Sequence, residues 1–277
     1  MSEATSRLTA ALNDVGAATR RVIAVANQKG GVGKTTTAVN LATALAQAGR
    51  RILIIDLDPQ GNASTGLGID RRARTAGTYQ LLVSDSPAAS LLRATSIDKL
   101  AMIPADPNLA GAEVELVGLD RREFRLRRAL ATLPDDAFNH IIIDCPPSLG
   151  LLTLNGLVAA HAVLVPLQCE FFALEGISQL VRTVDQVKRS LNPELELQGI
   201  VLTMFDRRNN LSDLVASDAR SFFGSRVYDT VIPRNVRISE SPSHGKPVII
   251  YDKASPGAAA YVTLAQEFLR REGLAAA

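Results

Sequence analysis

The sequence predicts an α/β fold with a doubly wound, mostly parallel sheet that is flanked by helices. Runs of branched apolar residues alternate with stretches of helical periodicity along most of the chain. A glycine-rich turn separates the first apolar run from the first helix, and acidic residues directly follow two later runs. Because ligands of such folds bind at the carboxyl ends of parallel strands, these segments are the candidate functional site.

The length of 277 residues, with 47% hydrophobic content, allows one large α/β domain or two small ones. We expect a single domain over residues 21–272, preceded by an arm over residues 1–20 and followed by a short tail over residues 273–277. Apolar residues recur at helical spacing in the arm. We favour a frayed or docked arm, and a helix that binds a partner or DNA is the alternative.

The first strand, turn and helix predict a phosphate-binding loop. Residues 22–26 form a continuous apolar run, typical of a buried strand, and residues 35–48 have the apolar periodicity of a helix. Glycine backbones in the intervening turn can close around phosphate oxygens, and the helix N-terminus adds unpaired N–H donors. The predicted nucleotide contacts in this loop are Lys29, Gly30, Gly31, Val32, Gly33, Lys34, Thr35 and Thr36.

This loop predicts ATP and Mg²⁺ as cofactors. Lys34 is in position to contact the β- and γ-phosphates, and the Thr35 hydroxyl is in position to ligate Mg²⁺. The loop departs from the common pattern because position 28 is Gln and a second lysine, Lys29, lies inside it. Lys29 is too near the base of the loop to repeat the role of Lys34. One role left for it is to contact the nucleotide of a second protomer, as an arginine finger does.

The motif KGGVGKT of residues 29–35 is the deviant Walker A pattern. With this motif the chain resembles the ParA/MinD branch of P-loop ATPases, which also includes the nitrogenase iron protein. The resemblance covers about residues 21–270 and implies that Lys29 acts in trans within an ATP-sandwich homodimer.

Two aspartates follow the apolar run of residues 51–55, in the segment DLDPQGN of residues 56–62. Asp56 lies at the predicted strand end and can be structural, whereas Asp58 lies in the loop, where it can contact water near the γ-phosphate. A turn residue that caps Gly61 is the alternative role of Asp58. The segment resembles switch I of ParA proteins, which implies that Asp58 acts in hydrolysis and lies at the metal site.

A third carboxylate follows the apolar run of residues 140–143, in the segment DCPPS of residues 144–148. Branched apolar residues followed by Asp form the Walker B arrangement, which places Asp144 to hold Mg²⁺, usually through water. The segment resembles the opening of switch II in the family. Cys145 lacks the further cysteines that an iron–sulfur cluster requires. The predicted metal site therefore consists of Thr35, Asp58 and Asp144.

The second half of the chain predicts more strands and a candidate base-binding loop. Further strands are expected at residues 100–104, 162–166, 199–204 and 227–232, and a long helix at residues 174–191. Residues 168–176, QCEFFALEG, resemble a ParA segment. The Pro-Arg-Asn sequence after the last strand resembles the ParA loop that flanks the adenine, which implies Pro233 and Asn235 as base contacts.

Four cations in predicted loops are candidate DNA contacts: Arg207, Arg208, Arg237 and Lys246. Taken singly, each fits a solvated surface charge. The resemblance implies that Arg208 and Arg237 occupy positions where ParA proteins bind double-stranded DNA without sequence preference. Such binding neutralises phosphates with several cations and weakens steeply with salt. No aromatic residues interleave these arginines, so stacking on single-stranded DNA is not expected.

An arginine-rich amphipathic helix is predicted over residues 121–133, with Phe124 and several leucines on one side. We favour a solvated helix face for its arginines, and contact with DNA is the alternative.

Composition limits the function classes. The net charge of +2 means that any nucleic-acid site is a local patch. Two cysteines are too few for a disulfide scaffold, and no signal peptide or spanning segment is present, so we expect a cytoplasmic protein. MinD relatives end in a basic amphipathic membrane-targeting helix, whereas residues 272–277 are too weakly apolar and basic to anchor. We therefore expect association with the nucleoid and not with a membrane.

Together the motifs imply a ParA/Soj-type ATPase of chromosome or plasmid partition, with slow hydrolysis unless a partner stimulates it. The implied partners are a second copy of the chain, non-specific double-stranded DNA and a ParB-type centromere-binding protein. Two rival functions remain: a MinD-like membrane ATPase, and a metallocluster carrier or cobyrinate-type amide synthase.

Overall fold

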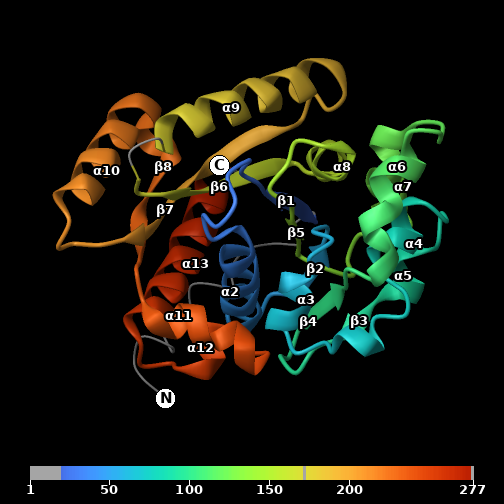
Figure 1. The fold of residues 1–277 in the computed structure, drawn as a ribbon, viewed down its shortest axis with the longest axis horizontal. Coiled ribbons are helices and arrows are strands. Elements are labelled where there is room, and N and C mark those ends of the chain that lie inside the picture. Colours follow the sequence, from blue (N-terminus) through green and yellow to red (C-terminus); the bar gives the residue numbers. More distant parts are fainter. Residues whose placement is uncertain (1–19, 171–172, 276–277) are drawn as a thin grey trace.

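The computed structural model describes residues 20–170 and 173–275. An eight-stranded sheet with the order β3-β4-β2-β5-β1-β6-β7-β8 forms its centre (Figure 1). The strands are β1 (Arg21–Val25), β2 (Ile52–Asp56), β3 (Arg93–Ala94), β4 (Leu100–Ile103), β5 (His140–Asp144), β6 (Ala162–Gln168), β7 (Glu196–Phe205) and β8 (Val227–Pro233). All neighbouring strands are parallel except β3 and β4, which are antiparallel. The predicted doubly wound, mostly parallel α/β fold is confirmed.

Helices cover both faces of this sheet. They are α2 (Lys34–Gln47), α3 (Asn62–Gly66), α4 (Thr78–Leu82), α5 (Ala88–Leu91), α6 (Ala112–Leu116), α7 (Arg125–Leu130), α8 (Leu151–Ala159), α9 (Ala173–Ser190), α10 (Asn210–Phe223), α11 (Val236–Glu240), α12 (Val248–Tyr251) and α13 (Pro256–Ala275). Helices α7, α8, α9 and α10 share one core with the sheet, and α2, α12 and α13 share the other. No helix in the described ranges is both long and apolar enough to span a membrane.

The central strands are buried on both faces, which explains their unbroken apolar sequences. In β1, Val22 and Ala24 belong to the core beneath α8 and α9, while Ile23 and Val25 belong to the core beneath α2 and α13. Because successive side chains of a strand point to opposite faces, a strand between two helical layers needs apolar residues at every position.

Strand register brings the predicted acidic residues together. In the parallel pairings of β5 with its two neighbours, Asp144 lies beside Val25 of β1 on one side and beside Asp56 of β2 on the other. The carboxyl ends of β1, β2 and β5 therefore meet at one edge of the sheet. The loop that follows β1 and both carboxylates open onto the same place.

Three predicted segments differ from the structure or lie outside it. The helix expected at residues 121–133 is shorter, because a 3₁₀ turn at Arg122–Phe124 precedes α7, which ends at Leu130. Helix α13 continues to Ala275 and so includes the first residues of the predicted tail, residues 273–277. Most of the predicted arm, residues 1–19, lies outside the described residues, as do Phe171 and Phe172 of the QCEFFALEG segment.

Candidate nucleotide site

The glycine-rich loop connects β1 directly to the first turn of α2. Gly31 and Gly33 have φ angles of 76° and 87°, in the left-handed region that other residues rarely adopt. Gly33 is also the N-cap residue of α2, so the N–H groups of the first helical turn face the loop. A Cβ atom on Gly31 would meet nothing within 4 Å. The loop therefore requires glycine there for its backbone angle and not for lack of space.

Two polar side chains that the sequence analysis missed hold this loop in place. Asn27 donates a hydrogen bond to the carbonyl of Pro166 at 2.8 Å, and its own side-chain oxygen accepts from the Lys29 N–H at 3.0 Å. The Thr203 hydroxyl of β7 donates to the carbonyl of Val32 at 2.8 Å. Both bonds join residues more than 130 positions apart, so no local pattern in the sequence signals them.

The two lysines of the loop have different surroundings. Lys34 is buried, and its ammonium donates to the backbone carbonyl of Lys29 at 2.9 Å. Burial lowers the pKa of Lys34, and the charges of Asp144 and Asp58 act in the opposite direction. Lys29 is exposed, and its ammonium pairs with Glu170 at 2.6 Å. The structure thus places Lys34 inside the site and Lys29 at its rim.

The three aspartates at the sheet edge are buried and differ in their partners. Asp56 accepts hydrogen bonds from the N–H and hydroxyl of Ser64 at 2.8 and 2.6 Å, which fits the structural role considered for it. Burial raises the pKa of Asp56 to about 6. Asp58 accepts from the Gln60 N–H at 2.9 Å with one oxygen, and its backbone carbonyl accepts from the Gly61 N–H. Asp58 is therefore a turn residue that still carries a second carboxylate oxygen.

Asp144 is the unusual carboxylate of the site. Its side chain is fully buried, and neither oxygen has a hydrogen bond of standard geometry. Burial raises its pKa well above the ordinary value, while the nearby Thr35 hydroxyl and Lys34 act to lower it. A buried charged group without partners is costly unless a ligand satisfies it. A cation or its water would do so, and oxygen donors such as Asp144 and Thr35 fit Mg²⁺.

The predicted base contacts line a small pocket next to the loop. Pro233 and Asn235 share this pocket, of about 100 Å³, with Gly33 and Thr36. Asn235 is the N-cap residue of α11, and its side-chain oxygen accepts from the Arg237 N–H at 2.9 Å. The loop after β8 and the glycine-rich loop are thus brought together, although almost 200 residues separate them in the sequence.

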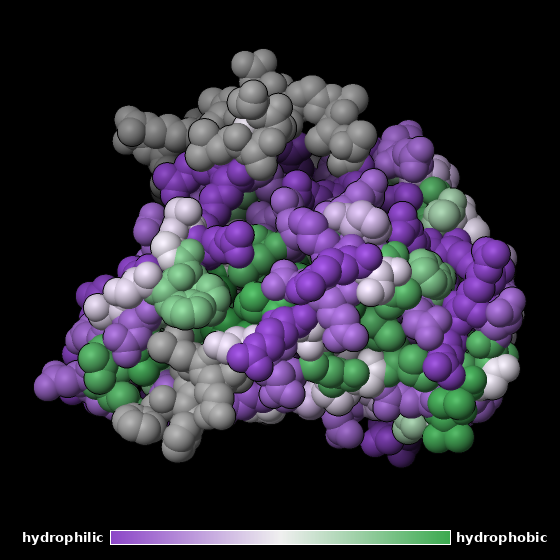
Figure 2. Space-filling view, turned by 90° about the horizontal axis from the view of Figure 1, so that it is seen from above, coloured by the Kyte–Doolittle hydropathy of each residue, from purple (hydrophilic) through white to green (hydrophobic). Residues whose placement is uncertain are grey.

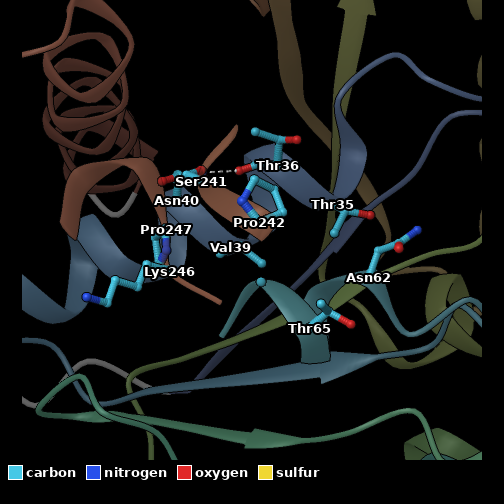
Figure 3. Close-up of a pocket in the computed structure, with 11 residues that line it drawn as sticks. Thr35, Thr36, Val39, Asn40, Asn62, Thr65, Ser241, Pro242, Lys246 and Pro247 are labelled. Atoms are coloured by element: carbon cyan, nitrogen blue, oxygen red, sulfur yellow. Dashed lines mark hydrogen bonds between the residues drawn. The ribbon is translucent and has the colours of Figure 1, made fainter. Parts of the chain in front are cut away.

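A second cavity, of about 250 Å³, lies beside the start of α2 (Figure 3). Its lining comes from the start of α2, from α3 and from residues 241–247, so it joins Thr35 and Thr36 to Lys246. Residues 241–247 and the end of α3 approach closely. A Cβ atom on Gly245 would lie only 3.0 Å from the Cα atom of Gly68, which follows α3. Helix α3, which follows the Asp58 loop, and the segment that carries Lys246 are therefore in direct contact.

The predicted DNA contacts lie at the surface, and two of them are paired with carboxylates. Arg207 and Arg208 follow β7, and Arg208 forms an ion pair with Asp206 at 2.8 Å. Arg237 pairs with Glu240 at 2.9 Å and with Asp252 at 3.3 Å. Lys246 is exposed at the rim of the cavity beside α2. Figure 3 shows its ammonium pointing away from Thr35.

Comparisons with known proteins agree on the family. A family model described as an AAA domain matches residues 20–197. The chain is 57% identical over 253 residues to "Chromosome partitioning protein ParA" of Caulobacter vibrioides. This match covers 91% of this chain and 95% of that protein. It is 52% identical over 247 residues to "Sporulation initiation inhibitor protein Soj" of Bacillus subtilis, with 89% and 97% covered.

Solved structures share the fold. A cobyrinic acid a,c-diamide synthase from Mycobacterium smegmatis, with bound ADP and magnesium, has a TM-score of 0.80 and 42% identity, covering 92% of this chain and 96% of that one. The cell division ATPase MinD of Pyrococcus furiosus has a TM-score of 0.75 and 26% identity, with 90% and 98% covered. From the phosphate-loop geometry together with these relatives we conclude that the chain is an ATPase and belongs to the ParA/Soj family of chromosome-partitioning ATPases.

Proposed function

We propose that this chain is a DNA-partition ATPase that forms an ATP-dependent homodimer, binds double-stranded DNA without sequence preference, and is released when a ParB-type centromere-binding protein stimulates hydrolysis. The observation that carries the nucleotide part is Asp144, a buried carboxylate that has no hydrogen bond of standard geometry and lies beside Thr35 and the phosphate loop. The names of the relatives support the partition role. We further propose that the protein is cytoplasmic and associated with the nucleoid.

In this mechanism the chain supplies positioning and charge. The backbone of residues 30–33 and the first turn of α2 surround the phosphates, and Lys34 neutralises their charge. Thr35 and Asp144, with Asp58 nearby, would hold Mg²⁺, and the ion would supply further charge neutralisation at the phosphates. Asp58 orients the attacking water with the carboxylate oxygen that does not serve the turn. Pro233 and Asn235 flank the base in the pocket next to Gly33.

The contact between α3 and residues 241–247 supports coupling between nucleotide binding and DNA binding. Because Gly68, which follows α3, meets Gly245 there, a shift of α3 would press on the segment that carries Lys246. Dimerisation doubles the number of cations that face one DNA molecule, which raises avidity without any new contact. The ion pairs of Arg208 and Arg237 limit the free charge of one protomer, so a single protomer is expected to bind weakly.

Binding to random-sequence duplex DNA with ATP, with ADP and without nucleotide tests the proposal. We expect binding only with ATP, a steep loss of affinity with rising salt, and at least about a tenfold loss in Arg208→Ala and in Arg237→Ala. Arg189→Ala, a change at an exposed arginine of α9, is the matched control and should bind like the parent. Equal DNA binding in all nucleotide states, or no DNA binding in any of them, would refute the proposed ATP-dependent binding of DNA.

The cobyrinic acid a,c-diamide synthase title on a 42% identical structure makes the amide-synthase function a rival to be tested. That function predicts ADP release that depends on a carboxylate substrate and an amide donor and that duplex DNA leaves unchanged. Measuring ADP release with each addition separates the two. A MinD-like function would instead appear as ATP-dependent co-sedimentation with phospholipid vesicles.

A further inference from the structure

The far end of the molecule from β8 carries three arginines around an apolar groove. The groove has a volume of about 460 Å³ and is lined by Arg121, Phe124, Arg127, Arg128 and Ala131. Phe124 is half-buried and the three arginines are exposed. The volume falls within the range of about 300–1,000 Å³ that is typical of ligand sites. The ring of Phe124 and the methyl group of Ala131 give the groove an apolar floor between charged walls.

The charge of these three arginines is available to a ligand. Within residues 20–170 and 173–275, no carboxylate lies within ion-pair distance of Arg121, Arg127 or Arg128. Arg125 of the same helix differs, because it is buried, donates to the Leu82 carbonyl at 2.8 Å and pairs with Asp85 at 2.9 Å. Arg125 therefore fastens α7 to the body, and the other three arginines have no such structural role.

Exposed apolar side chains extend this surface. Val114 is 80% exposed and Val117 is 60% exposed, and the Val117 carbonyl accepts a hydrogen bond from Arg122 at the start of the groove segment. Figure 2 shows hydrophobic and strongly hydrophilic residues side by side at the right-hand end of the molecule, the end where Figure 1 places α6 and α7. Exposed apolar residues rimmed by charge are typical of a protein interaction site.

The groove is separate from three of the four predicted DNA contacts. Arg207, Arg208 and Arg237 follow β7 and β8, which form one edge of the sheet, whereas α7 lies toward the opposite edge (Figure 1). A DNA duplex that binds these three arginines would not require the groove for further contacts. Phosphates would satisfy the arginines, but a DNA backbone offers no side chain for the apolar floor.

We propose that this groove binds a short acidic segment of a partner protein, one in which an aliphatic or aromatic side chain lies among Asp and Glu residues. Carboxylates form bidentate hydrogen bonds with guanidinium groups, and the apolar side chain packs on Phe124 and Ala131. The partner would then lie one helix away from Asp144, the carboxylate proposed to hold Mg²⁺. Asn155 of α8 accepts from the Leu126 N–H at 3.1 Å and donates to the Arg122 carbonyl at 2.8 Å, and α8 begins shortly after Asp144.

Fluorescence anisotropy with short labelled peptides tests the proposal on the full chain. The first peptide is rich in Asp and Glu and contains Leu and Phe; the second has the same charge with Ser in place of the apolar residues. We expect saturable binding of the first peptide, weaker binding of the second, and at least about a tenfold loss of affinity in Arg127→Glu/Arg128→Glu, because reversing two charges replaces attraction to the peptide carboxylates with repulsion.

Arg189→Glu is the matched control, because Arg189 is an exposed side chain in the last turn of α9. An acidic residue there has the same unfavourable interaction with the helix C-terminus as one at Arg127 or Arg128. Arg121→Glu lies outside α7 and repeats the test if the double variant does not fold. Equal affinity of parent and variants, or equal affinity for the two peptides, would overturn the proposal. The proposal would also be overturned if the binding of labelled duplex or single-stranded DNA depended on Arg127 and Arg128 while the binding of the peptide did not.

Discussion

At the scale of single residues, the site depends on how each carboxylate is satisfied. Asp56 is fully buried and bonded to Ser64, Asp58 gives one oxygen to a turn, and Asp144 has no standard hydrogen bond. Three aspartates at one sheet edge therefore have three different roles open to them: support for the fold, water orientation and metal binding. Their chemistry follows from their hydrogen bonds and not from their residue type.

Asp58→Asn separates the turn role of Asp58 from its proposed catalytic role. The amide oxygen can still accept from the Gln60 N–H, so the turn persists, but the charge that orients water is lost. We expect steady-state ATP hydrolysis to fall about 100-fold or more while nucleotide binding changes little. Isothermal titration with a non-hydrolysable ATP analogue gives the binding side of this comparison. A variant that hydrolyses ATP at the parent rate would leave Asp58 only its role in the turn.

His161 makes stability depend on pH. Its Nδ1 accepts a hydrogen bond from the Val22 N–H at 2.8 Å, which requires a neutral ring, and burial lowers its pKa. Because the folded-state pKa lies below the unfolded value of about 6.5, the unfolded chain takes up the proton first as the pH falls. The stabilisation is complete above pH ~6.5 and is lost as the pH falls through the folded-state pKa. Thermal unfolding between neutral and mildly acidic pH should therefore show a smaller loss of Tm in His161→Asn than in the parent.

At the scale of elements, helix α13 positions the strand that leads to the base pocket. Glu267 of α13 is buried and accepts from the N–H groups of Asp229 and Thr230 in β8, both at 2.9 Å, and from Arg271. Burial by itself raises the pKa of Glu267, but these hydrogen bonds outweigh burial and lower it. Strand β8 ends at Pro233, so this carboxylate helps to hold the candidate base contacts in place.

Glu267→Ala should lower the free energy of unfolding by about 2–4 kcal/mol, because it leaves two backbone donors and a guanidinium without their acceptor. Glu267→Gln keeps one acceptor oxygen and should cost less. Urea unfolding followed by circular dichroism measures both values. If Ala and Gln cost the same, the charge and not the hydrogen-bonded geometry ties α13 to β8.

At the scale of the whole molecule, the proposed dimer requires a rearrangement of Lys29. In the described protomer its ammonium pairs with Glu170, and each side chain is 44% exposed. For Lys29 to reach a partner's nucleotide, this pair must open. An exposed ion pair contributes about 0–1 kcal/mol, so the pair is a weak restraint that ATP binding can overcome.

Light scattering after size-exclusion chromatography tests this point. Lys29→Ala should remain monomeric with ATP while still binding the nucleotide through Lys34. Glu170→Gln releases Lys29 and should strengthen ATP-dependent dimerisation by up to about fivefold, the factor that 1 kcal/mol allows. A Lys29→Ala protein that dimerises like the parent would contradict the trans role of Lys29.

The amino-acid sequence alone was enough to predict the α/β class, most strand positions and the glycine-rich loop, and to place Lys34, Asp58 and Asp144 at or after the ends of β1, β2 and β5. These are local features: a strand buried on both faces is apolar throughout, a left-handed turn needs glycine, and a carboxylate at a strand end follows its strand directly. The arginine-rich segment of residues 121–133 was the least predictable. Its charge pattern alone did not reveal that Arg125 is buried while Arg127 and Arg128 are exposed.

Only the tertiary structure decided which of these groups meet. Strand register put Asp56 beside Asp144. Thr203 of β7 and the Pro166 carbonyl of β6, which accepts from Asn27, hold the glycine loop, and Glu170 pairs with Lys29. The contact of Gly68 with Gly245, and the cavity that joins Thr35 to Lys246, likewise depend on how α3 packs on the C-terminal segment. Such contacts join residues far apart in the chain, and they are set by the packing of whole layers, which leaves no local pattern in the sequence.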